Sequence, residues 1–340
     1  MREVPANLTP AYKSAESAYK QAGDPKERLE LLREMLRLIP KHKGTDHLQA
    51  DIKSKIKELT EALTGPKKGG SRGGPPTSFR PEGAGQIALL GPPNTGKSSV
   101  HVHLTGSHSE TGPYPFTTQY PQPGMMPHLD IAFQLIDLPP ISSQHPISWI
   151  GNTLQSADAC LLVVDLGHPE CIEETLAVHE ILAERKVQLT ERWPSDGGTI
   201  GDPNDPFTLY LPTLLVATKA DRSSDPEADL DVFEELTGFR YPYLGISIEH
   251  GIGVDTLGST LFERLQVVRV YTKAPGKAPD LERPYTMRKG QTIENLAELV
   301  HRDFAAGLQY ARVWGDESFD GQHVGRDHLL VDGDVVELHM

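Results

Sequence analysis

Hydrophobic and polar residues follow three successive patterns along the chain. Up to about residue 63, apolar side chains recur every three or four positions, the spacing of amphipathic helices. From residue 86, short continuous apolar runs alternate with helical stretches; the runs are QIALL, IAFQLI, ACLLVV, TLLVA and YLGIS. From about Val267, strand-like segments surround one helical segment, TIENLAELVHRDF. The patterns therefore predict three structural units.

The first unit, residues 1–63, is predicted to be a helical arm. The stretch DPKE, beginning at Asp24, supplies an N-cap, a first-turn proline and a capping-box glutamate. Pro40 ends that helix, and a second apolar stripe follows from Leu48 to Leu63. We predict a helical hairpin whose apolar stripe packs on the rest of the protein.

Residues 64–83 are rich in Gly, Pro, Ser and basic residues, a composition typical of a flexible linker. The linker and the adjacent helix contain the clearest concentration of positive charge in the chain, which comprises Lys41, Lys43, Lys53, Lys55, Lys57, Lys67, Lys68, Arg72 and Arg80. Two interpretations stay open. The segment is either a solvated tether or a contact for RNA phosphates.

The second unit, residues 84–266, is predicted to be a doubly wound α/β domain. Its apolar runs are mostly continuous, as in parallel strands that are covered on both faces, and they alternate with helices. The third unit, residues 267–340, has the pattern of a compact α+β domain.

Composition narrows the class of protein. The formal net charge of −14 excludes a uniformly basic surface, so DNA is not an expected partner. The two cysteines cannot form a disulfide framework, and no apolar stretch approaches the length of a membrane span. We therefore expect a soluble cytoplasmic protein with no secretory signal and no membrane contact.

The strongest chemical signal is GPPNTGKSS, which matches G-x-x-x-x-G-K-[ST] between a predicted strand and a predicted helix. Glycines let backbone N–H groups curl around a polyphosphate, and the following helix adds its positive end. Lys97 would reach the β- and γ-phosphates, and the Ser98 hydroxyl would ligate Mg²⁺. The candidate phosphate-binding residues are Gly91, Asn94, Thr95, Gly96, Lys97, Ser98 and Ser99.

A base-recognition signal follows the predicted strand TLLVA. The tetrapeptide Thr218-Lys219-Ala220-Asp221 is a T-K-x-D variant of the guanine signature N-K-x-D. The Asp221 carboxylate can accept hydrogen bonds from N1–H and the 2-amino group of guanine, two donors that adenine lacks. Lys219 would lay its aliphatic stem against the base, and Ser247 fits a short loop on the other side of the base. The sequence therefore predicts GTP and GDP as ligands.

Two loops between these signals are candidate switches. Thr118, or alternatively Thr117, could turn its hydroxyl toward Mg²⁺ and its backbone toward the γ-phosphate. Asp137, which ends the strand IAFQLI, would hold Mg²⁺ through a water molecule. The predicted metal set is therefore Ser98, Thr118 and Asp137, with Thr118 and Lys97 as the candidate catalytic residues.

The motifs YPFTT, GPPNTGKSS and DLPP together resemble those of Obg-related GTPases, most closely the developmentally regulated GTP-binding (DRG) branch. The segment KHKGTDHLQADIKSKIKEL resembles the helical preamble of that branch. VRVYTKAPG and YARVWG resemble its TGS domain, a ubiquitin-like β-grasp module. The resemblance implies GTP binding, slow hydrolysis, and association with ribosomes or translation factors, with the TGS domain as a protein-binding module.

Three positions depart from the family pattern. Pro140 replaces the glycine of D-x-P-G, whose N–H senses the γ-phosphate, and proline has no N–H to donate. The small domain that the family often inserts before the guanine signature is reduced to a long loop. Ile141 replaces the water-orienting glutamine of many GTPases, a hydrophobic choice common in this group, and Gln144 or His145 could substitute.

Two functions of different classes follow from these observations. The first is a Mg²⁺-dependent GTPase switch, and the second is a guanine-nucleotide-binding scaffold that Pro140 has disabled as a switch and that acts through its TGS-like domain. A third hypothesis is an RNA-binding protein that is regulated by nucleotide, and the basic linker is the sole support for it.

Asn94 suggests that K⁺ assists hydrolysis. Some GTPases use an asparagine at this loop position to bind K⁺ beside the phosphates, although a loop-stabilising role is the alternative. If Asn94 ligates K⁺, GTP hydrolysis is faster in potassium than in sodium chloride. Equal rates in the two salts contradict the hypothesis.

Overall fold

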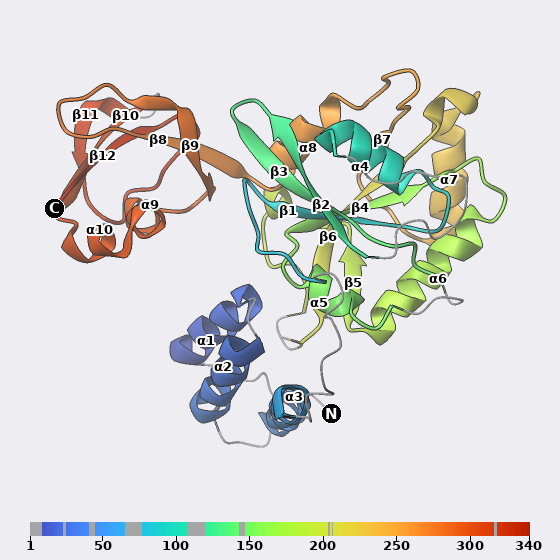
Figure 1. Ribbon diagram of the computed structural model, residues 1–340, viewed down its shortest axis with the longest axis horizontal. Helices are drawn as coiled ribbons and strands as arrows, with labels where there is room; N and C mark the ends of the chain where they lie inside the picture. The colour runs from blue at the N-terminus through green and yellow to red at the C-terminus, as the bar shows by residue number, and fades with distance from the viewer. Residues whose placement is uncertain are drawn as a thin grey trace, which may run out of the picture.

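The computed structural model describes residues 9–22, 25–40, 45–64, 77–107, 120–142, 147–202, 205, 207–315 and 318–340. Within these residues a central α/β body is flanked by a helical arm and by a smaller β-rich body (Figure 1). The β-rich body contains the C-terminus, and the arm lies below the central body in the view of Figure 1.

The central body is built on a seven-stranded sheet with the strand order β2-β3-β1-β4-β6-β5, and β7 also pairs with β6. Every pairing is parallel except that of β2 with β3. The strands are β1 (Gln86–Leu90), β2 (Gln122–His128), β3 (Ile131–Asp137), β4 (Ala159–Val164), β5 (Val187–Thr190), β6 (Leu209–Ala217) and β7 (Tyr243–Gly245).

Helices cover both faces of this sheet, because alternate residues of each central strand point to opposite faces. Ile87 and Leu89 of β1 join the core under α4 and α8, whereas Ala88 and Leu90 join the core under α5, α6 and α7. The predicted doubly wound α/β fold is therefore confirmed. The helices are α4 (Lys97–Thr105), α5 (Ile150–Leu154), α6 (Cys171–Glu184), α7 (Pro226–Thr237) and α8 (Thr256–Arg264).

Two strands of the sheet were not expected from the sequence. β2 has the sequence QPGMMPH, whose prolines and glycine are typical of a loop. Its edge position explains the prolines, since an edge strand need not donate on both sides. β5 has only four residues and pairs with the first part of β6 alone. In both cases tertiary pairing overrides the local signal.

The C-terminal body is a five-stranded sheet with the order β11-β10-β12-β8-β9, in which β12 runs parallel to β8. Ile293, Leu296 and Ala297 of α9 pack into its core, as a β-grasp domain requires. The predicted single helix divides at His301, which is extended with φ −172°. The elements are β8 (Val267–Thr272), β9 (Asp280–Arg288), α9 (Ile293–Val300), α10 (Arg302–Gly307), β10 (Tyr310–Gly315), β11 (Ser318–Val324) and β12 (Val335–His339).

The described residues of the arm form three helices, α1 (Pro10–Gln21), α2 (Pro25–Leu38) and α3 (Asp46–Thr64). The hairpin predicted from the sequence corresponds to α2 and α3, and α1 is an additional helix against α2. The arm core also receives Phe207, from the loop between β5 and β6, and the Lys55 ammonium lies 4.3 Å from the centroid of that ring. The loop between β5 and β6 thus contributes an anchor for the arm. The predicted cap at Asp24 lies outside the described residues.

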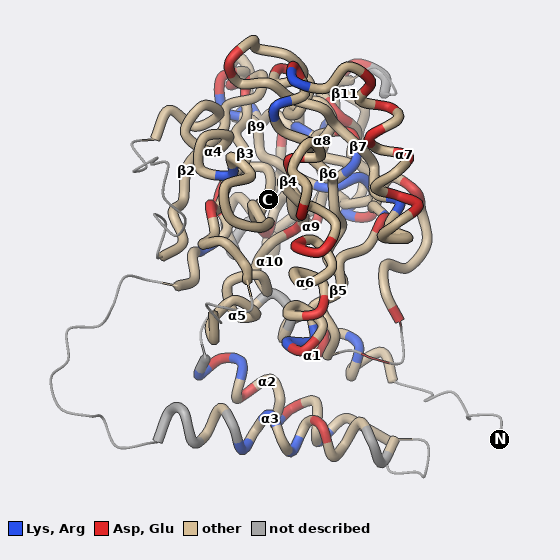
Figure 2. Tube along the Cα trace, turned by 90° about the vertical axis from the view of Figure 1, so that its right-hand side faces the viewer, with Lys and Arg blue, Asp and Glu red and all other residues tan. Residues whose placement is uncertain are grey.

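Basic residues of the described part of the arm are distributed differently on its two longer helices. Lys and Arg are interspersed with Glu along α2, whereas Lys53, Lys55 and Lys57 follow one another along α3 (Figure 2). Of the basic concentration expected from the sequence, Lys53, Lys55, Lys57 and Arg80 are described, and the other members lie outside the described residues. The choice between a tether and an RNA contact therefore stays open.

Polar contacts join the C-terminal body to the turn between β2 and β3. Arg269 of β8 donates from Nη1 to Asp130 Oδ1 at 2.9 Å and from Nη2 to Asp332 Oδ2 at 2.7 Å. The Tyr271 hydroxyl also donates to Asp130. Burial opposes ionisation of Asp130, but the hydrogen bonds from Tyr271 and Arg269 outweigh it and lower its pKa. The hairpin between the two candidate switches is thereby attached to this body.

The Phe207 anchor leads to a stability prediction. Phe207→Ala leaves a cavity in the arm core, and a buried Phe→Ala change costs about 3–5 kcal/mol. We expect α1–α3 to exchange amide hydrogens faster and to be cleaved sooner by protease, while the central sheet is unchanged. Leu236→Ala on α7, where the side chain is 61% exposed, is the matched control. Equal protection of the arm in both variants contradicts the anchor.

Candidate functional site

The phosphate loop begins at Gly91, immediately after β1. Gly91 has φ 146°, and a Cβ atom added there would lie 2.2 Å from the Val163 carbonyl oxygen of β4. Only glycine fits both this backbone conformation and this close approach. Gly96, with φ 90°, precedes α4, so the positive end of that helix faces the loop.

Lys97 is the cation of the loop. Its side chain is buried, and Nζ donates to the Pro92 carbonyl at 2.5 Å. Burial lowers the pKa of Lys97 to about 8, although Asp137 and Glu174 partly counteract it. A buried ammonium with a carbonyl as its hydrogen-bond partner is suited to receive phosphate oxygens.

A hydroxyl and a carboxylate meet beside the loop. Ser98 Oγ at the start of α4 donates to Asp137 Oδ2 at the end of β3, at 2.7 Å, and Asp137 is fully buried. These oxygen donors fit the preference of Mg²⁺ for hard ligands. Of the three predicted metal ligands the structure brings these two together. Thr118 and the alternative Thr117 lie outside the described residues.

The T-K-A-D loop lies at the same edge of the sheet as the phosphate loop, and the two loops are hydrogen-bonded to each other. The buried Thr218 hydroxyl donates to the Thr95 carbonyl at 2.6 Å, a link between residues 123 positions apart in sequence. The Thr218 N–H donates to the Val164 carbonyl at the end of β4. The hydroxyl that replaces the usual asparagine amide therefore joins the two loops.

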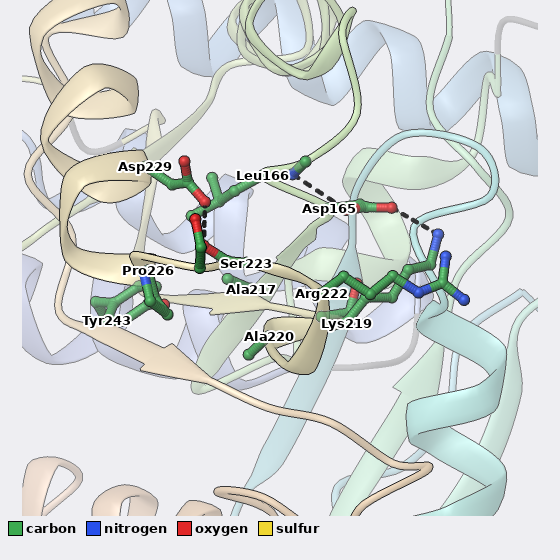
Figure 3. Close-up of a pocket in the computed structure, with 13 residues that line it drawn as sticks. Asp165, Leu166, Ala217, Lys219, Ala220, Arg222, Ser223, Pro226, Asp229 and Tyr243 are labelled. Atoms are coloured by element: carbon green, nitrogen blue, oxygen red, sulfur yellow. Dashed lines mark hydrogen bonds and ion pairs between the residues drawn. The ribbon is translucent and has the colours of Figure 1, made fainter.

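Lys219 takes a left-handed conformation, with φ 56°, and its ammonium pairs with Asp165 Oδ2 at 2.6 Å. This ion pair fixes the aliphatic stem that we predict to cover the base. A cavity of about 370 Å³ opens beside the pair, at the carboxyl ends of β4 and β6 (Figure 3). Arg222, Asp229 and Tyr243 are also part of its wall.

Asp221 and Ser247 come from neighbouring loops that are joined by the hydrogen bond from the Ala220 N–H to the Ile246 carbonyl, at 3.1 Å. The Ser247 side chain is the largest cause that lowers the pKa of the Asp221 carboxylate. Ser247 itself is buried. The structure thus brings together the loops that carry the two predicted base-recognition residues.

Two polar residues near this site were not identified from the sequence. Asp165 directly follows β4, a position at which parallel strands present functional side chains. His250 lies with its Nδ1 atom 3.5 Å from Asp221 Oδ2. The carboxylate that ends ACLLVVD was a usable signal for Asp165, whereas His250 lies in a loop whose closure the sequence does not specify.

The second candidate switch begins in contact with the phosphate loop. Pro140 is buried, and the N–H of the next residue, Ile141, donates to the Gly91 carbonyl at 3.2 Å. In this conformation neither residue presents an N–H to a γ-phosphate. Gln144 and His145, the suggested substitutes for a water-orienting glutamine, lie outside the described residues.

Comparison with known proteins agrees with this geometry. Residues 86–191 match the family described as 50S ribosome-binding GTPase, and residues 268–340 match the TGS domain. The chain is 28% identical over 366 residues to an uncharacterized GTP-binding protein of Methanocaldococcus jannaschii, with 92% of both chains covered. It is 28% identical over 353 residues to developmentally-regulated GTP-binding protein 1 of Xenopus laevis, covering 88% of this chain and 94% of that protein.

Among solved structures, the chain is similar to a GTP-binding protein from Pyrococcus horikoshii OT3, with a TM-score of 0.48 and 17% identity, over 75% of this chain and 99% of that chain. Within the described residues, no helix is long and apolar enough to cross a membrane.

A phosphate loop at the carboxyl edge of a doubly wound sheet, followed by a TGS domain, defines a P-loop GTPase with a C-terminal β-grasp module. Within that class the chain is similar to developmentally regulated GTP-binding proteins, such as those of Arabidopsis thaliana and Xenopus laevis, over about nine-tenths of its length. The resemblance drawn from the motifs is therefore confirmed.

The hydrogen bond between the two loops leads to a binding prediction. Thr218→Val keeps the shape of the side chain but leaves the buried Thr95 carbonyl without its donor, which costs about 1–3 kcal/mol. We expect GDP affinity to fall about tenfold or more, as measured by displacement of a fluorescent GDP analogue. Thr218→Ser is the matched control because it keeps the hydroxyl. Unchanged affinity of the valine variant contradicts a role for this bond.

Proposed function

We propose that this protein is a guanine-nucleotide switch that binds GTP with Mg²⁺ and slowly hydrolyses it to GDP in the cytoplasm. The proposal rests chiefly on the position of the phosphate loop and the T-K-A-D loop at one edge of the sheet, joined by the Thr218–Thr95 hydrogen bond. One ligand with phosphates at one end and a base at the other can then reach both loops. GTP and GDP contain both groups, a chain of phosphates and a guanine base.

In this proposal the phosphates bind the N–H groups of the Gly91–Ser99 loop and the Lys97 ammonium. Ser98 and Asp137 would hold Mg²⁺, which neutralises charge on the phosphates when bound. Lys219 covers the base, and Asp221 accepts hydrogen bonds from its N1–H and 2-amino groups. Adenine would leave this carboxylate unpaired and is therefore rejected.

The switch action depends on how the hairpin of β2 and β3 is connected. Thr118 precedes β2 in the sequence, and β3 ends at Asp137, so both candidate switches are joined to one hairpin. The turn of that hairpin is bonded to Arg269 and Tyr271 of the TGS domain. We infer that a change of nucleotide at the loops would alter the hairpin and thereby the TGS domain.

Ribosomes or translation factors are the proposed site of action. The description of the family matched by residues 86–191 names binding to the 50S ribosome, and a TGS domain accompanies that match. Contact with RNA or with a protein that binds the TGS domain would be the physical link. This part of the proposal rests on family likeness, and the nucleotide site does not depend on it.

The alternative function is a scaffold that binds GTP and GDP without switching. Pro140 has no N–H, and the Ile141 N–H is already bonded to Gly91. Loss of one charge-assisted hydrogen bond to phosphate lowers the preference for GTP over GDP by about 1.5–3 kcal/mol. The scaffold would then act through its TGS domain whichever nucleotide is bound.

Single-turnover GTP hydrolysis with Mg²⁺ tests the proposal. We expect phosphate release from GTP and none from ATP. We also expect Asp221→Asn to weaken the binding of GTP and to allow the binding of xanthosine triphosphate. Xanthine has a carbonyl oxygen in place of the 2-amino group, and the asparagine amide of the variant can donate a hydrogen bond to that oxygen. Guanine-nucleotide binding without any phosphate release would favour the scaffold.

Pro140→Gly separates the switch from the scaffold further. Restoring an N–H at this position is expected to raise the ratio of GTP to GDP affinity by about tenfold or more. A wild-type ratio near one together with a raised ratio in the variant supports the scaffold. A wild-type protein whose switch loops already gain protease resistance with GTP, and not with GDP, supports the switch.

A further inference from the structure

The loop that carries Ser247 is closed by its own backbone. The Ser247 N–H donates to the Ile252 carbonyl, and the Ile252 N–H donates back to the Ser247 carbonyl, both at 3.0 Å. Gly253 follows with φ 70°, and a Cβ atom there would lie 2.2 Å from the Gly245 carbonyl oxygen. The loop is therefore confined to a narrow range of conformations.

Inside this closed loop His250 is directed at the base-recognition carboxylate. Its backbone N–H donates to Ser247 Oγ at 3.3 Å. Its imidazole Nδ1 lies 3.4 Å from Ser247 Oγ and 3.5 Å from Asp221 Oδ2. The His250 side chain is 56% exposed, so core packing does not require it at this position.

These contacts orient the Ser247 hydroxyl. Because Ser247 Oγ accepts the His250 N–H, its own proton is available to a neighbouring acceptor, and the Ser247 side chain is the largest cause that lowers the pKa of the Asp221 carboxylate. The imidazole, with a proton on Nδ1, is a second donor toward the same carboxylate. Two donors from one rigid loop thus restrict rotation of the carboxylate.

We propose that His250 is a positioning residue for guanine recognition, which holds the Asp221 carboxylate so that both oxygens face the base. The inference rests on the proposed nucleotide site and deepens it. A fixed carboxylate accepts from N1–H and from the 2-amino group together. A freely rotating carboxylate accepts one hydrogen bond but gains less binding energy from the second donor. His250 therefore sets the discrimination between guanine and hypoxanthine, because hypoxanthine lacks the 2-amino group.

A purely electrostatic role makes a different prediction. Glu249 lies beside the pair, with ligand atoms of Asp221, Glu249 and His250 within 4.8 Å of one another, and Arg222 also acts on the Asp221 charge. If His250 only offsets negative charge, Glu249→Gln would compensate for the loss of His250. It would then raise the affinities for GDP and IDP by the same factor. Positioning instead changes the two affinities by different factors.

The test compares equilibrium affinities of GDP and inosine diphosphate, IDP, in the full chain with Mg²⁺. We expect His250→Ala to lower the affinity for GDP about fivefold and the affinity for IDP less than twofold. His250→Asn is the matched control, because its amide nitrogen is the same number of bonds from Cα as Nδ1 and can donate; it should restore GDP affinity to within twofold. Ser247→Ala should lower the ratio of GDP to IDP affinity in the same direction.

The contradicting result is a ratio of GDP to IDP affinity that His250→Ala leaves unchanged, whether both affinities fall together or neither falls. His250→Leu, which keeps side-chain bulk, repeats the test if the alanine variant is unstable, and thermal unfolding reports the stability of each variant. Failure of the proposed site looks different. In that case the wild type does not prefer GDP to ADP, and Asp221→Asn does not admit xanthosine diphosphate.

Discussion

The nucleotide site depends on one close backbone approach, that of Gly91 to Val163. Where β1 ends, the chain must turn across β4 at a distance that no side chain permits. This turn directs the phosphate loop over the carboxyl edge of the sheet and starts α4 with its positive end toward the loop. Thr218, at the end of β6, then reaches the same loop through its hydroxyl. The phosphate loop and the proposed base-recognition loop are therefore organised by three adjacent parallel strands, and their relative position is a property of the sheet.

The two flanking bodies are attached to the central domain by different chemistry. The core of the arm receives a buried ring, Phe207, from the loop between β5 and β6. The TGS domain makes directional polar contacts from Arg269 and Tyr271 to the turn between β2 and β3, and Arg288 contacts Ala84 and Asp158 before β1 and β4. An apolar anchor tolerates rotation, whereas an ion pair with fixed geometry transmits displacement of the hairpin. In the proposed switch, the TGS domain rather than the arm would therefore be the body that reports the bound nucleotide.

The sequence predicted the elements whose signals are local. Continuous apolar runs identified the central strands, and the phosphate-loop and T-K-A-D motifs identified residues that the fold brings to one edge. It missed β2 and β5 because their pairing partners, and not their own residues, make them strands. It missed His250 because the contact with Asp221 requires closure of the loop from Ser247 to Ile252, a non-periodic backbone arrangement. The Lys219–Asp165 pair likewise depends on the adjacency of β4 and β6, which topology supplies.

The most direct test of this account is amide hydrogen exchange, measured by mass spectrometry, with and without a saturating concentration of GDP and Mg²⁺. The account predicts slower exchange in two separate segments, residues 91–99 and residues 217–222, with ADP giving no such protection. Protection of both segments by one ligand would show that they form a single guanine-nucleotide site. Protection confined to other parts of the chain, or equal protection by ADP, would contradict the central claim.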